Sequence, residues 1–115
     1  MADQARRFLA RVEAGQVEAI LEDVIVAELV WTLHSFYGRS KAQIAELLEP
    51  IVALPGLLNS DRESLLQALW LYVQFNVDFA DALLAAKALT SGDNTVCSFD
   101  RDFERMPGLR REEPG

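Results

Sequence analysis

The chain has 115 residues, of which half are hydrophobic and a quarter charged. This composition suits one folded domain and excludes a disordered chain. A single cysteine excludes an internal disulfide, and no apolar run reaches the roughly 20 residues of a membrane-spanning helix. We therefore expect one cytoplasmic domain over residues 1–115. The formal net charge of −7 argues against a simple nucleic-acid binder, although carboxylates gathered at a metal site would account for part of it.

Hydrophobic periodicity predicts helices that alternate with short apolar strands. Helices are expected at 3–14, 23–37, 40–54, 60–75 and 79–89, and strands at 17–21, 57–58, 94–98 and 109–111. S-x-x-Q and S-x-x-E spacing predicts capping boxes at Ser40 and Ser60. Asp23 is a candidate cap of the second helix, Pro50 should kink or end the third, and Trp70 is placed on the buried side of the fourth. The alternation indicates an α/β fold with a short parallel sheet flanked by helices.

Acidic residues lie at the ends of these predicted elements, each among apolar neighbours. Glu28 lies in VIVAELVW, and Asp100 and Asp102 directly follow the strand TVCSF. Ligands gather beyond the carboxyl ends of strands in open α/β sheets, and clustered carboxylates hold Mg²⁺ or Mn²⁺ for phosphodiester cleavage. The alternatives are an exposed position on the helix for Glu28 and an Asx turn formed by Asp102.

A second acidic pair, Asp78 and Asp81, lies in VDFADALLAA at the start of the fifth predicted helix. Asp81 is a candidate metal ligand, although the helix dipole alone would favour an anion there. Asp78 is either a second ligand or simply the N-cap. Arg101 and Arg105 flank Asp100 and could contact RNA phosphates, or they are solvated surface charges.

Other catalytic chemistries find little support in the sequence. His34 is the only histidine and Cys97 the only cysteine, which argues against a Ser-His-Asp arrangement and against a zinc site. We expect His34 to be packed or exposed, and Cys97 to be a buried, inert thiol.

Three stretches, VIVAELVWTLHSFYG, VDFADALLAA and SFDRDFERMPGLR, occur in an order and spacing that resemble a PIN domain, in particular the VapC-like toxin ribonucleases. The resemblance implies a three-layer α/β fold and Mg²⁺- or Mn²⁺-dependent cleavage of RNA. Glu28, Asp81 and Asp100 match the second, third and fourth acidic positions of the family, and Asp78 and Asp102 match accompanying carboxylates. It also implies a cytoplasmic toxin, usually dimeric, that is neutralised by a small antitoxin.

The N-terminus departs from the family pattern, because the first strand and its aspartate have no counterpart before Asp3. Three explanations stay open: the sequence begins late, the protein is a natural remnant without nuclease activity, or another chain or second copy supplies the strand. The expected function is a toxin-type endoribonuclease that is impaired or incomplete as the chain stands. The alternatives are a non-catalytic PIN-like dimerisation or antitoxin-binding protein, and an ordinary α/β protein whose acids are surface charges and caps.

Overall fold

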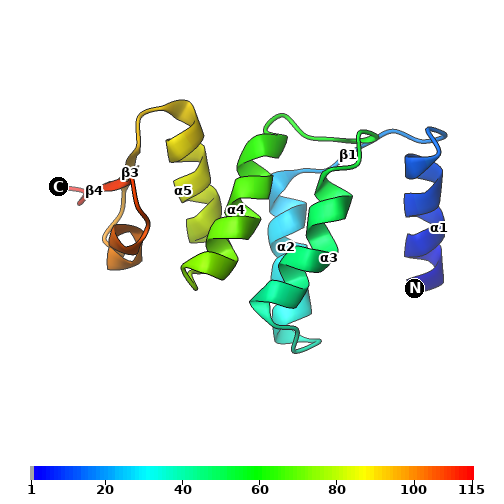
Figure 1. Cartoon of the computed structure of the whole chain (residues 1–115), viewed down its shortest axis with the longest axis horizontal. Helices are drawn as coiled ribbons and strands as arrows, with labels where there is room; N and C mark the ends of the chain where they lie inside the picture. The colour runs from blue at the N-terminus through cyan, green and yellow to red at the C-terminus, as the bar shows by residue number, and fades with distance from the viewer. Residues whose placement is uncertain (1) are drawn as a thin grey trace.

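The computed structural model describes residues 2–115, which form five α-helices, one 3₁₀ helix and four short strands (Figure 1). The α-helices are α1 (Ala2–Glu13), α2 (Asp23–Ser35), α3 (Lys41–Val52), α4 (Arg62–Gln74) and α5 (Phe79–Ser91). The strands are β1 (Ala19–Ile20), β2 (Leu57–Leu58), β3 (Thr95–Cys97) and β4 (Arg110–Glu112), and the 3₁₀ helix is η1 (Arg101–Arg105). The predicted α/β fold with short parallel strands is confirmed.

The strands form two separate parallel pairs. β1 pairs with β2, with Ala19 opposite Leu57, and β3 pairs with β4, with Thr95 opposite Arg110. Within residues 2–115 no strand joins the two pairs. Val96 points into the core from β3, so the neighbouring Cys97 points outward. The prediction that Cys97 is buried was therefore wrong, because the thiol is exposed.

The hydrophobic core lies between α2, α3, α4 and α5, which stand side by side in the middle of the molecule (Figure 1). α5 supplies small buried residues, Ala82, Ala85 and Ala86, each 0% exposed. Small side chains let helices approach closely, and α5 packs extensively against α4. Trp70 faces away from this contact and is 56% exposed, so its predicted burial was wrong.

Helix α1 lies at one end of the molecule, and β3, β4 and η1 lie at the other (Figure 1). Val12 of α1 is buried and lies against Gly56. A Cβ atom at position 56 would stand 2.8 Å from Val12 Cγ1 and 3.2 Å from the Val17 carbonyl oxygen. Gly56 is therefore required for the close approach between α1 and the turn before β2.

Several helix ends differ from their predicted caps. The Ser40 capping box is present, but α4 is capped by Asp61, which accepts a hydrogen bond from the Ser64 amide at 3.2 Å, and not by Ser60. Asp23 is the first residue of α2 and instead pairs with Lys87 at 2.9 Å. Pro50 lies in the last turn of α3, where its missing N–H removes one helical hydrogen bond. The helix does not end at Pro50 and continues to Val52.

One arginine joins α3, β2 and α4. Arg62 donates hydrogen bonds to the carbonyl oxygens of Val52 at 3.0 Å, Leu54 at 3.2 Å and Leu57 at 2.7 Å. The bond to Val52 satisfies a carbonyl that the end of α3 leaves without a helical partner, and the other two tie α4 to the turn and to β2. No helix within residues 2–115 has the length and apolar character needed to cross a membrane.

Candidate metal centre

Three of the predicted carboxylates come together where the start of α5 meets the segment after β3. Asp81 lies in the first turn of α5, Asp100 is the N-cap of η1, and Asp102 lies within η1. Each offers a ligand atom, and these atoms lie within 4.8 Å of one another. Asp81 and Asp102 are half-buried and Asp100 is exposed, so the group opens to solvent on one side.

Local hydrogen bonds fix the segment that carries Asp100 and Asp102. The Asp100 amide donates to Ser98 Oγ at 3.0 Å, and the Asp102 amide donates to Asp100 Oδ1 at 2.9 Å. The Asx turn is thus formed by Asp100 rather than by Asp102. Phe103, 1% exposed, anchors η1 in the core, and Arg111 donates to the Ser98 carbonyl oxygen at 3.2 Å.

The carboxylates repel one another across this site. Burial raises the pKa of Asp81, and the charges of Asp100, Asp78 and Asp102 raise it further. Within the described residues, the cationic partner of this group is Arg105, whose Nη2 lies 3.2 Å from Asp102 Oδ1. A divalent cation would relieve the repulsion, and an all-carboxylate donor set matches the preference of Mg²⁺ and Mn²⁺ for oxygen. The residues present therefore fit such an ion.

The other predicted site residues lie outside this group. Glu28 is exposed on α2, and its role as a ligand stays a prediction. Asp78 occupies the N-cap position of α5, but its side chain makes no capping hydrogen bond. Arg101 is exposed beside the cluster, whereas Arg105 also reaches the Asn76 carbonyl oxygen at 3.5 Å.

Lys41 is a charged residue that sequence reasoning missed. Its Nζ donates to the Val77 carbonyl oxygen at 2.7 Å and lies 4.5 Å from the centre of the Tyr72 ring. Burial lowers the pKa of Lys41, while the neighbouring carboxylates Asp78 and Asp102 oppose this effect. The only sequence signal at this position is the capping box of α3, which says nothing about the contact between α3 and the start of α5.

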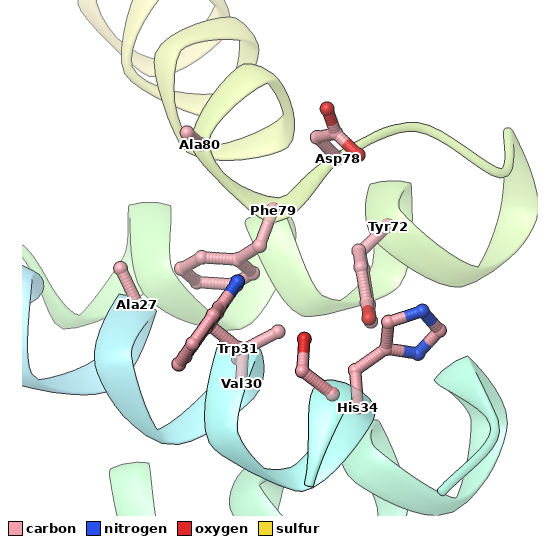
Figure 2. A pocket seen from close by; sticks show the side chains of 9 residues that line it. Ala27, Val30, Trp31, His34, Tyr72, Asp78, Phe79 and Ala80 are labelled. Carbon is pink, nitrogen blue, oxygen red and sulfur yellow. The ribbon is translucent and has the colours of Figure 1, made fainter. Parts of the chain in front are cut away.

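A pocket of about 500 Å³ lies between α2, α4 and the start of α5, with Asp78 in its lining (Figure 2). It is lined by Ala27, Val30, Trp31, His34, Ser35, Tyr72, Asp78, Phe79 and Ala80. In Figure 2 the Trp31 and Phe79 side chains lie on one side and Tyr72 with His34 on the other, with Asp78 at the rim. Sequence reasoning did not find this pocket, since three separate segments form it.

The model of the PIN domain family matches residues 1–109. The chain belongs to the PIN domain family, and this membership indicates a nuclease-like function in general terms. No curated protein and no solved structure matches the chain.

Proposed function

We propose that the chain is a divalent-metal-dependent endoribonuclease of the VapC-like toxin type. The observation that supports it most directly is the convergence of Asp81, Asp100 and Asp102 within 4.8 Å. Asp81 comes from a different helix than Asp100 and Asp102, and capping does not explain the three together, because only Asp100 among them caps a helix.

In this proposal Asp81, Asp100 and Asp102 hold Mg²⁺ or Mn²⁺. When bound, the ion supplies positive charge to the phosphodiester oxygens and acidifies water for hydrolysis. Asp100 is held at its position by Ser98 and by the amide of Asp102, and partial burial of Asp81 limits solvation of the site. Arg101 and Arg105 contact RNA phosphates on the open side, where Arg101 is exposed.

The biological setting that we propose is the cytoplasm, with RNA as the substrate, a small cognate antitoxin as inhibitor and a homodimer as the assembly. Glu28, on the solvent side of α2, is proposed as a further ligand that binds when the ion or the substrate is present. The family's general association with RNA and with divalent metals supports this setting.

A second candidate function is a non-catalytic PIN-like protein that dimerises or binds an antitoxin. The observation that favours it is the apolar outer surface of α2, where Val24 is 61% and Ile25 42% exposed. Exposed apolar patches of this kind mark interaction surfaces. This reading predicts a stable dimer and no binding of Mn²⁺.

The test is cleavage of a 5′-labelled single-stranded RNA pool by the full chain with Mn²⁺ and with EDTA. Asp100→Asn keeps the cap of η1, because asparagine caps as well as aspartate, but removes a charged ligand. We expect the rate of RNA cleavage by Asp100→Asn to fall more than about 100-fold. Residues that only support a metal site typically cost ~10–100-fold. Asp93→Asn, an exposed change in the loop after α5, should cleave like the unmodified chain. Equal cleavage by both variants would contradict the proposal.

A further inference from the structure

We propose that the pocket between α2, α4 and α5 binds one unpaired nucleobase of the RNA substrate, with Trp31 as the stacking surface and Asp78 as the hydrogen-bond acceptor that selects guanine. This inference rests on the proposed nuclease function for its substrate class.

The floor of the pocket is preformed. Tyr72 and Phe79 are 3% and 5% exposed, and their rings meet edge to face with centroids 6.0 Å apart. Lys41 holds the Tyr72 ring through a cation–π contact, with Nζ 4.5 Å from the ring centroid. A volume of about 500 Å³ lies within the range of about 300–1,000 Å³ found for small-molecule sites.

Trp31 stands at the open side of this floor and is 60% exposed. The Trp31 and Phe36 rings meet edge to face, with their centroids 5.4 Å apart and their planes at 78°. This contact positions the Trp31 side chain. An exposed indole beside a nuclease site offers a base a stacking surface, and base–aromatic stacking is the common mode of holding single-stranded RNA.

Asp78 supplies the polar group at the rim. It lines the pocket, yet its carboxylate makes no capping hydrogen bond to α5, so both oxygens are free to accept from a ligand. An ionised carboxylate is an acceptor pair. Guanine presents two adjacent donors on its Watson–Crick edge, the ring N1–H and the exocyclic N2–H₂, which match that pair.

The pocket lies next to the candidate metal centre. Asp78 and Asp81 are one helical turn apart at the start of α5, and the charge of Asp78 is one of those that raise the pKa of Asp81. A base in the pocket would therefore place its own phosphodiester near the three carboxylates. The subsite would fix which linkage is presented for cleavage.

The experiment is calorimetric titration of the full chain with GMP, IMP, AMP, CMP and UMP in EDTA, so that no metal contributes. IMP differs from GMP by the loss of the N2 amino group and tests the second donor. We expect GMP to bind more tightly than IMP and UMP, and Asp78→Asn to remove the difference between GMP and IMP. Equal binding of all five nucleotides would overturn the role of Asp78.

Trp31→Ala should weaken GMP binding by about 5- to 150-fold, the range for loss of one stacking aromatic. Trp31→Phe should restore part of the affinity and guards against a folding defect. Trp70→Ala is the matched control, since Trp70 is 56% exposed on α4 and lies outside the pocket. Equal effects of Trp31→Ala and Trp70→Ala, or no nucleotide binding at all, would overturn the subsite and leave the pocket to a protein partner.

The two proposals fail separately. RNA cleavage that survives Trp31→Ala without change would remove the subsite and keep the nuclease. GMP binding that depends on Trp31 in a chain that neither binds Mn²⁺ nor cleaves RNA would keep the subsite and remove the nuclease.

Discussion

At the scale of single residues, the position of each carboxylate relative to its neighbours matters more than the apolar character of the sequence around it. Glu28 lies among apolar residues in the sequence, yet α2 presents several of these residues to solvent, including Val24 and Leu29. Asp81 lies in a similarly apolar stretch but is half-buried and faces two other carboxylates. Apolar neighbours along a helix therefore do not predict burial, because packing selects only one side.

Asp81→Asn should stabilise the metal-free chain at neutral pH. The pKa of Asp81 in the folded protein is raised above its ordinary value of 3.8 by burial and by neighbouring carboxylates. The folded state therefore loses stability as pH rises from that value through the folded pKa, and the loss persists at pH 7. Thermal unfolding in EDTA should give a higher Tm for Asp81→Asn at pH 7, with the difference vanishing below pH 3.8. An equal or lower Tm for Asp81→Asn at pH 7 would contradict the expected destabilisation by the charged Asp81 side chain.

Asp61 should stabilise α4 in a pH-dependent manner. Hydrogen bonding from Ser64 lowers the pKa of Asp61 from its ordinary value of 3.8, and Lys87, 3.5 Å away, lowers it further. Because this pKa is lowered on folding, the stabilising contribution of Asp61 is complete above pH 3.8 and is lost as the pH falls through the pKa of the folded state. Asp61→Ala should cost about 0.5–2 kcal/mol at pH 7 in urea unfolding, and the deficit should narrow toward pH 3. Ser60→Ala, which removes the cap that the sequence suggested, should cost nothing measurable. A larger loss of stability in Ser60→Ala than in Asp61→Ala would contradict the observed cap.

At the scale of elements, the helices follow from the sequence because their apolar residues recur at a spacing close to 3.6, and this spacing survives in the structure of α3, α4 and α5. The strands were predicted within one or two residues, although β1 and β2 are only two residues long. Caps were less predictable, since adjacent residues such as Ser60 and Asp61 compete for one helix end and only tertiary contacts decide between them.

The junction of α3, β2 and α4 depends on Arg62, which has carbonyl oxygens rather than a carboxylate as its partners. Arg62→Met should lower the free energy of unfolding by about 2–4 kcal/mol, because bonds to charged groups contribute about 1.5–3 kcal/mol each and water satisfies some freed carbonyls. Urea unfolding measures the change. The exposed Arg39 offers a control: Arg39→Met should change the free energy of unfolding by less than about 0.5 kcal/mol. A similar small effect at both positions would show that the three bonds do not stabilise the junction.

At the scale of the whole molecule, the chain is elongated. Its radius of gyration is 15.2 Å and its extents are 47 × 30 × 22 Å, whereas a compact domain of about 100 residues has a radius of gyration near 13 Å. The elongation reflects the two separate strand pairs and the position of α1 at one end (Figure 1). The candidate centre belongs to the opposite end, where α5 packs against β3.

The sequence singled out the three carboxylates that come together in the structure, and their role as metal ligands stays a prediction. Asp81, Asp100 and Asp102 were predicted because each follows a strand or begins a helix, and such positions meet at one edge in α/β folds. Lys41 and Trp31 could not be found in this way. Their positions beside the start of α5 depend on contacts that α3 and α2 make with that segment, and no short-range pattern encodes those contacts.

We propose that Asp81, Asp100 and Asp102 form a divalent-metal site, and calorimetric titration of the full chain with Mn²⁺ is the experiment that decides this claim. We predict saturable binding at one site by the unmodified chain and by Asp93→Asn, and its loss in Asp81→Asn, because Asp81 is the half-buried member of the cluster contributed by α5. The same Mn²⁺ binding by all three proteins, or none by any of them, would contradict the claim.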